Sequence, residues 1–173
     1  MVPTLFGACD LDGSRVTADW DTHRFFWIGG GAFSGKTTSA KALVEDFEAQ
    51  GGEALVFIDF VSEARHFDTK LYTFTAERDM IPTVEELADE RLSSAGPHAP
   101  LLIVVEDWDG EVSETLAARL LQVARHAERL NAWVVATSEQ MLVAPDFSDL
   151  VPRRFFCRRH GDDYYIMDGV VRP

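Results

Sequence analysis

The sequence predicts an α/β fold in which helices cover both faces of a mostly parallel sheet, with an antiparallel hairpin at each end of the chain. Three observations predict it. A glycine-rich loop stands between an apolar run at residues 25–28 and a segment with helical periodicity. Apolar runs follow at residues 54–58, 101–105 and 132–136, separated by helical or irregular segments. Continuous apolar strands that alternate with helices are typical of parallel sheets buried on both faces.

The first elements follow this order. Residues 5–20 are predicted to form a hairpin with Asp12-Gly13 at its turn. The apolar run at residues 25–28 is predicted to be the first strand of the sheet. The helix after the loop turns one apolar face toward the core and ends at Gly51-Gly52. That face consists of Ala40, Leu43, Val44 and Phe47.

The middle of the chain begins with a second strand at residues 54–58. Residues 61–82 are predicted to be irregular apart from a short strand at residues 71–74. Residues 83–86, Thr-Val-Glu-Glu, have the sequence of a capping box. They are therefore predicted to open a short helix that ends near Ser94.

The last elements are a strand at residues 101–105, a long helix over residues 112–130 and a strand at residues 132–136. One apolar stripe runs along the helix. It consists of Leu116, Leu120, Val123, Ala127 and Leu130. Residues 154–158 and 164–167 are predicted to pair as a closing hairpin around a turn. We expect both terminal hairpins to add antiparallel edges to the sheet.

The glycine-rich loop carries the most specific chemistry in the chain. From Gly30 to Thr37 it matches the pattern G-x-x-x-x-G-K-[ST] at every specified position, which predicts a P-loop NTPase fold of the RecA/ASCE-like kind. The glycines let backbone N–H groups turn toward phosphate oxygens, and the helix that begins here adds its positive end. Lys36 would place a charge on the outer phosphates, and the Thr37 hydroxyl would ligate Mg²⁺. The residues expected to contact ATP are Gly30, Gly31, Ala32, Phe33, Ser34, Gly35, Lys36, Thr37 and Thr38.

Polar residues also follow the predicted strands at the edge where open α/β sheets bind ligands. Glu106 and Asp107 come directly after one apolar strand, and Asp59 and Thr137 each end another. One carboxylate there would hold Mg²⁺, and a second would orient or deprotonate the attacking water. Asp59 is equally well explained as a turn cap, and Thr137 is more simply a strand-closing hydroxyl than a γ-phosphate sensor. We therefore predict catalytic roles for Lys36, Glu106 and Asp107, and metal ligation by Thr37 and Glu106.

Bulk properties limit the remaining choices. A length of 173 residues suits one domain with a core, so residues 1–173 are expected to form a single ATPase domain. No apolar run approaches the roughly 18–20 residues of a membrane span, and the first residues lack a signal-peptide pattern. The two cysteines, Cys9 and Cys157, are too few and too far apart in the sequence to indicate a disulfide framework. We therefore expect the protein to lie in a reducing cytoplasm.

The formal charge of −13 argues against a surface that coats nucleic acid, but is compatible with a motor that touches phosphates at a few positions. Basic residues gather in two places. A solvated helix face or strand end is the simpler interpretation of each. The first group is Arg119, Arg125, His126 and Arg129, and the second is Arg153, Arg154, Arg158, Arg159 and His160.

The strand at residues 101–105 with the two acids after it resembles the Walker B pattern of P-loop ATPases that hydrolyse nucleotide. The usual order in that pattern is Asp then Glu, whereas this chain has Glu106 then Asp107. The resemblance implies that Asp107 acts as the water-activating residue with a side chain one methylene shorter.

More of the chain resembles the motor domain of the FtsK/HerA superfamily of DNA-pumping ATPases. Residues 10–16 are similar to the hairpin that precedes the loop in that family, and residues 56–59 to its second strand and terminal Asp. Residues 97–100 are similar to the segment before its Walker B strand. Residues 123–137 resemble its "ARxAGIHLxLAT" segment, although Ser138 stands where Gln usually follows.

This resemblance covers nearly all of the chain. It implies an Mg²⁺-dependent motor that hydrolyses ATP and drives DNA translocation, packaging or transfer. DNA is then the expected partner, and the expected assembly is a homo-oligomeric ring, such as a hexamer, in which a neighbour's arginine completes each site. Arg125, Arg153 and Arg154 are the candidates for that arginine. The short length favours a phage or plasmid relative in the cytoplasm of a bacterium or an infected host cell.

Two alternatives stay open. One is a small-molecule P-loop kinase, which usually needs a basic lid, whereas residues 61–82 contain few bases among several acids. The other is a nucleotide-binding regulatory module with weak hydrolysis, which the inverted order of Glu106 and Asp107 favours.

Overall fold

The structure is a computed structural model, and it describes residues 4–8, 15–57, 72–108, 112–139, 153–160 and 163–170. Its strands are β1 (Thr4–Ala8), β2 (Arg15–Ala18), β3 (Phe25–Gly29), β4 (Glu53–Phe57), β5 (Tyr72–Phe74), β6 (Leu101–Val105), β7 (Ala132–Ser138), β8 (Arg153–His160) and β9 (Asp163–Val170). Its helices are α1 (Lys36–Ala49), α3 (Glu77–Ser93), α5 (Glu114–Arg125) and α6 (Ala127–Leu130).

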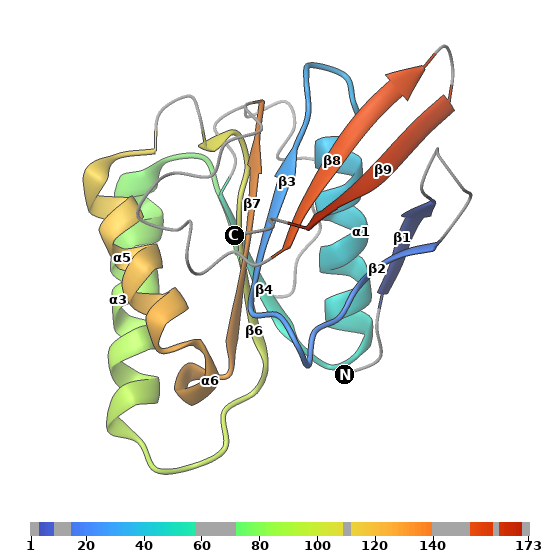
Figure 1. The fold of residues 1–173 in the computed structure, drawn as a ribbon. Helices are drawn as coiled ribbons and strands as arrows, with labels where there is room; N and C mark the ends of the chain where they lie inside the picture. The colour runs from blue at the N-terminus through green and yellow to red at the C-terminus, as the bar shows by residue number, and fades with distance from the viewer. Residues whose placement is uncertain are drawn as a thin grey trace.

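Seven of the strands form one sheet in the order β5-β4-β6-β7-β3-β8-β9. Every neighbouring pair is parallel except β8 and β9. Helix α1 covers one face of the sheet, and α3 and α5 cover the other (Figure 1). The predicted mostly parallel sheet with helices on both faces is therefore confirmed.

The two faces hold two cores, which the strands share by alternation. Phe26 and Ile28 of β3 belong to the core under α1, whereas Phe25 and Trp27 belong to the core under α3 and α5. Adjacent strand residues point to opposite faces, so an unbroken apolar run serves both cores. The residues predicted to face the core from α1 are all buried, which confirms that helical face.

Helix α3 begins earlier than the sequence predicts. It starts at Glu77 rather than at the proposed capping box, and Pro82 lies inside it. Thr83 Oγ1 donates to the Asp79 carbonyl oxygen at 3.4 Å instead of capping a helix. Met80 and Val84 are both buried on one face, and burying this i, i+4 pair favours helix through the proline.

The predicted long helix over residues 112–130 is two helices. α5 ends at Arg125, and His126 leaves the helical conformation with φ −112° and ψ 16° before α6 begins. Ala127 and Leu130 remain buried after the break. The apolar spacing therefore continues across the break, which is why periodicity alone does not reveal it.

The terminal hairpins differ from the prediction in their relation to the sheet. β1 and β2 pair antiparallel, but they form a separate two-stranded sheet, so the expected N-terminal edge is wrong. The hairpin contacts α1 and β9 and places the buried side chains of Val16, Ala18 and Trp20 in the core under α1. The closing hairpin does join the sheet, yet β8 pairs parallel with β3 and only β9 is antiparallel.

The strand order positions the site. β7 lies between β3 and β6, so the C-terminal ends of these three parallel strands share one edge. The loop of residues 30–35 follows β3, and Glu106 and Asp107 follow β6. Among the described residues, no helix is long and apolar enough to cross a membrane.

Candidate functional site

The loop of residues 30–35 links β3 to α1 and depends on its first glycine. Gly30 has a φ of 157°, and a Cβ there would lie 2.5 Å from both the Cys157 carbonyl oxygen and Ser34 Oγ. Its N–H donates to the Ser138 carbonyl oxygen at 3.0 Å. The start of the loop is therefore held against β7 and β8, with no room for a larger residue.

The N-terminus of α1 is suited to an anion. Its N-cap is Gly35, with φ 97°, which has no side chain to cap the first N–H groups, and the first turn has no acidic residue. A helix start without such groups leaves its N–H donors and positive dipole end to a ligand. Phosphate oxygens are the ligands that this arrangement suits.

Lys36 opens α1 with its side chain turned back over the loop. Its Nζ donates to the carbonyl oxygens of Gly30 at 2.7 Å and Gly31 at 3.1 Å, and the residue is buried. A buried ammonium needs such partners to offset its lost hydration. The charge is thereby fixed beside the helix start.

The two residues predicted to ligate the metal are in contact. Thr37 Oγ1 donates to Glu106 Oε2 at 2.8 Å, although 69 positions separate them in the sequence. Glu106 is only 1% exposed, and its N–H donates to the Phe57 carbonyl oxygen at 3.0 Å, which anchors it to β4. A hydroxyl beside a carboxylate is an oxygen donor set that suits Mg²⁺, which usually takes its other ligands from water and substrate phosphates. The described residues contain no group of three or more His, Cys, Asp or Glu side chains that could hold a metal ion.

Asp107 is held by its backbone. It has a φ of 52°, in the left-handed region that few non-glycine residues occupy, and its N–H donates to Thr137 Oγ1 at 3.0 Å. Thr137 is fully buried on β7. The hydroxyl that the sequence suggests as a strand end or a phosphate sensor thus supports the conformation of the second acid. No local sequence signal points to this contact, because β6 and β7 meet only in the sheet.

A second layer lies behind the loop. Ser39 Oγ donates to the Gly35 carbonyl oxygen at 3.0 Å and lies 3.5 Å from Cys157 Sγ. Burial raises the pKa of the Cys157 thiol, while the hydrogen bond with Ser39 and the charge of Lys36 act in the opposite direction. Ser34 Oγ is buried with no hydrogen-bond partner among the described residues. Sequence reasoning missed Ser39 and Cys157 because neither belongs to a motif.

The other predicted site residues either lie away from the contacts of Lys36, Thr37 and Glu106 or fall outside the described part of the structure. Ala32, Phe33 and Thr38 are exposed, and Phe33 at the loop tip is 84% exposed. Asp59 lies outside the described residues, and the side chains of Arg153 and Arg154 are not described. Arg125 lies at the C-terminal end of α5, beside Arg24 at the start of β3, on the edge of the sheet opposite to the loop.

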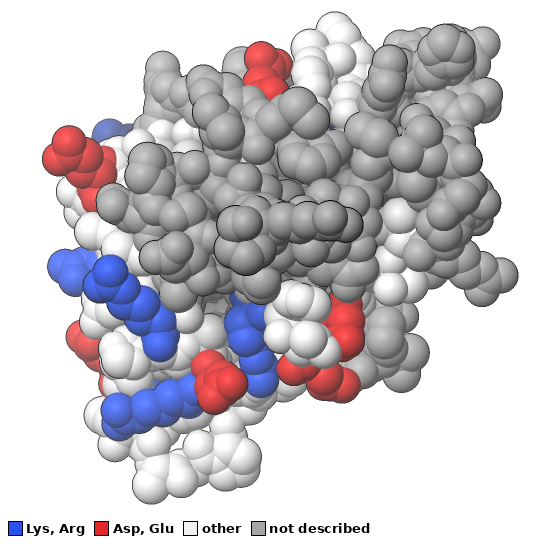
Figure 2. Space-filling model, viewed as in Figure 1, with Lys and Arg blue, Asp and Glu red and all other residues white. Residues whose placement is uncertain are grey.

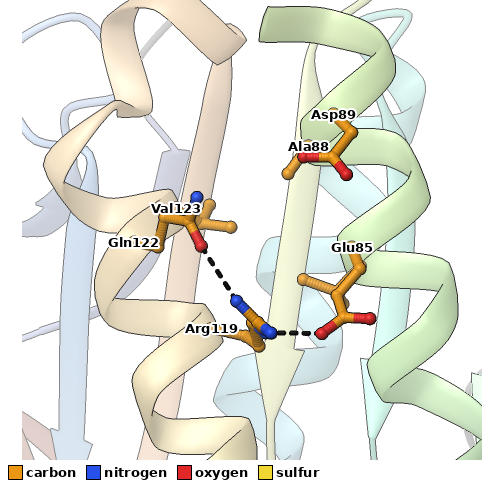
Figure 3. Close-up of a pocket in the computed structure, with 7 residues that line it drawn as sticks. Glu85, Ala88, Asp89, Arg119, Gln122 and Val123 are labelled. Atoms are coloured by element: carbon orange, nitrogen blue, oxygen red, sulfur yellow. Dashed lines mark hydrogen bonds and ion pairs between the residues drawn. The ribbon is translucent and has the colours of Figure 1, made fainter.

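A cavity of about 180 Å³ lies between α3 and α5 (Figure 3). Arg119 Nε lies 2.5 Å from Glu85 Oε1 across it, and an Arg119 terminal nitrogen donates to Gln122 Oε1 at 3.4 Å. These two helices cover the face of the sheet that α1 does not cover. The cavity is therefore separate from the loop and its acids.

Comparisons with known proteins identify the fold. No protein-family model matches the sequence, and the comparison with curated proteins gives no match. Solved structures do match. Thermomonospora curvata EccC, ATPases 2 and 3 in complex with a signal sequence peptide, superposes with a TM-score of 0.70 at 13% identity, over 89% of this chain and 33% of that one.

Two further solved structures are a conjugation coupling protein and a genome packaging NTPase. The pCW3 conjugation coupling protein TcpA, with ATPγS, gives a TM-score of 0.68 at 14% identity, over 89% of this chain and 53% of that one. The genome packaging NTPase B204 of Sulfolobus turreted icosahedral virus 2, with AMPPCP, gives a TM-score of 0.53 at 10% identity. The match covers 81% of this chain and 77% of that one. The chain spans about a third of the EccC structure and about half of the TcpA structure. The chain therefore shares the fold of these solved structures.

Proposed function

We propose that this chain binds ATP with Mg²⁺, hydrolyses it, and uses the energy to move DNA. The observation that supports this most is the 2.8 Å hydrogen bond between Thr37 and Glu106. It joins the first turn of α1 to the end of β6, the two places from which the sequence predicts metal ligands. The same fold in ATPases of secretion, conjugation and packaging supports the proposal at a coarser level.

Each polar group then has a role. Lys36 exchanges its bonds to the Gly30 and Gly31 carbonyls for bonds to the outer phosphates. The uncapped start of α1 binds phosphate oxygens through its N–H groups. Thr37 and Glu106 would hold Mg²⁺, which neutralises phosphate charge when bound. Asp107 would orient the attacking water.

The position of Asp107 favours one second candidate, a nucleotide-binding module with weak hydrolysis. Its carboxylate is one methylene shorter than the usual Glu, and its backbone is held in a left-handed conformation by Thr137. Reach and orientation strongly affect the activation of water, because small misplacements can cost orders of magnitude in rate. Nucleotide affinity without turnover would select this candidate over the motor.

DNA is the proposed cargo because two of the matched structures act in conjugation and genome packaging, as their names state. The formal charge of −13 implies that contacts to DNA are few and local. A homo-oligomeric ring is the proposed assembly. Arg125 lies on the edge of the sheet opposite to the loop of residues 30–35, so it does not reach the nucleotide site of its own copy.

The test is steady-state release of phosphate from ATP, with and without DNA, across protein concentration. Lys36→Ala should abolish turnover, while Lys41→Ala is the matched control, a partly exposed lysine of the same helix whose ion pair with Glu45 is worth little. Release of free phosphate, at a rate that increases when DNA is added, would support the motor. A phosphorylated small molecule would indicate the kinase, and tight binding without turnover the regulatory module. Failure of the chain to bind nucleotide would overturn the proposal.

A further inference from the structure

A basic groove lies on the edge of the sheet opposite to the loop of residues 30–35. It has a volume of about 410 Å³ and is lined by residues at the start of β3 and around the break between α5 and α6. Of the described residues that line it, four are basic, namely Arg24, Arg125, His126 and Arg129, and one, Glu128, is acidic. In a chain with a formal charge of −13, such a composition is unusual.

Arg24 forms the fixed wall of the groove. Its guanidinium carbon lies 3.8 Å from the centroid of the Trp133 ring, and one terminal nitrogen donates to Asn131 Oδ1 at 3.4 Å. Burial lowers the pKa of Arg24, whereas the charges of Glu128 and Asp21 act in the opposite direction. A planar guanidinium stacked on an indole is oriented in advance, so it loses little entropy on binding an anion.

Arg125 and Arg129 form the exposed wall of the groove. Both side chains are exposed, and Arg129 donates to the Leu92 carbonyl oxygen at 2.7 Å. Within the described part of the chain, neither they nor Arg24 has a carboxylate within 4 Å. In Figure 2 Lys and Arg side chains lie at the lower left with Asp and Glu side chains among them, in the part of the view where Figure 1 shows α3, α5 and α6.

The helix dipole explains only part of this arrangement. A cation in the last turn of α5 complements the negative end of that helix, which accounts for Arg125. Arg129 likewise lies in the last turn of the short helix α6, but the dipole does not account for Arg24, which directly precedes β3. Guanidinium groups from three parts of the chain therefore line one groove, in which three arginines outnumber the single acid Glu128.

We propose that this groove binds the phosphates of a nucleic-acid backbone. Guanidinium groups match phosphate oxygens in a bidentate geometry, and arginine dominates here. The groove has only the alanines Ala124 and Ala127 as apolar lining, whereas stable protein interfaces centre on large apolar or aromatic side chains. It is also open and spread along two helices, which suits a chain of phosphates better than a single small anion.

The inference rests on the proposed function for its choice of nucleic acid, but its site is separate from the nucleotide site. It replaces the simpler interpretation of Arg125, His126 and Arg129 as a solvated helix face. It also predicts that DNA contact does not require ATP.

The experiment measures binding of a fluorescent duplex DNA to the full chain by anisotropy, without nucleotide, at several salt concentrations. The Arg125→Gln/Arg129→Gln variant should bind DNA about tenfold more weakly, and the slope of log K against log salt should shrink by about 1.8 as two phosphate contacts are lost. The matched control is Lys41→Gln/Arg78→Gln, which removes the same charge from a partly exposed position on α1 and an exposed position on α3, outside the groove. It should bind DNA within about twofold of wild type.

The outcomes are separable. DNA affinity equal in the Arg125→Gln/Arg129→Gln variant and the control would overturn the inference, as would a wild-type chain that binds no DNA. A variant that changes the oligomeric state in sedimentation and leaves DNA affinity intact would identify an interface between copies and also overturn it. Lys36→Ala tests the proposed function separately, because it should abolish nucleotide binding and leave DNA binding unchanged.

Discussion

Thr37 and Glu106 share a 2.8 Å hydrogen bond between the first turn of α1 and the end of β6. Helix α1 follows β3 through the loop of residues 30–35, and β7 lies between β3 and β6 in the sheet. The hydrogen bond therefore exists only because the order of the strands brings both chain segments to the same edge. Four predictions test this edge and its supports.

Glu106→Gln should leave the fold intact and remove hydrolysis. The amide keeps the volume of a side chain that is 1% exposed and can still accept from Thr37, but it loses the charge that would hold the metal. We expect turnover to fall by about 100-fold or more, with nucleotide affinity changed far less. Phosphate release and fluorescent nucleotide titration measure the two effects. Asp89→Asn, an exposed acid on α3, is the control, and unchanged turnover in Glu106→Gln would contradict the assigned role.

Thr137→Val should weaken both the fold and the reaction, whereas Thr137→Ser should not. Valine has nearly the shape of threonine but cannot accept a hydrogen bond from the Asp107 N–H. That N–H therefore loses its bond to the side chain of residue 137, which is fully buried. The loss of a buried hydrogen bond of this kind costs about 1–3 kcal/mol of unfolding free energy. Urea denaturation measures that cost, and kcat should fall more than KM changes. If valine and serine behave alike in both measurements, the contact has no positioning role.

Gly30→Ala should weaken nucleotide binding strongly, and Gly31→Ala should not. A Cβ on Gly30 would meet the Cys157 carbonyl oxygen and Ser34 Oγ at 2.5 Å, and the φ of 157° is strained for alanine, whereas a Cβ on Gly31 would meet nothing within 4 Å. Relief of the clash must move the loop away from β7 and β8. We expect at least about a tenfold loss of affinity, equivalent to about 1.4 kcal/mol. Equal affinity in the two variants would show that the loop tolerates the shift.

Alkaline pH should destabilise the protein through Cys157. Burial raises the pKa of its thiol, so the folded state favours the protonated form. The contribution is fully present below the ordinary thiol pKa of about 8.5 and is lost as pH rises from there through the higher pKa of the folded state. Urea unfolding of a Cys9→Ser background should show this loss, and adding Cys157→Ala should make the dependence shallower. Equal slopes in the two proteins would contradict it.

The loop and the core faces could be predicted because they are local. The pattern from Gly30 to Thr37 specifies residue types at fixed spacing, and the apolar face of α1 follows from helical periodicity. Both depend on neighbours within a few positions, so one stretch of sequence contains the whole signal. The start of α3 at Glu77 was missed because a capping box and a proline suggested a local boundary, whereas burial of Met80 decided it.

By itself, then, the sequence determined the fold class, the strand-loop-helix unit and the identity of the acids after β6. Only the tertiary structure decided that Thr37 meets Glu106, that Thr137 supports Asp107, and that Arg24 joins Arg125 and Arg129 in one groove. The physical reason is that strand order and helix packing set these distances. They arise from burial summed over the whole chain, and no short segment records which strands will lie side by side.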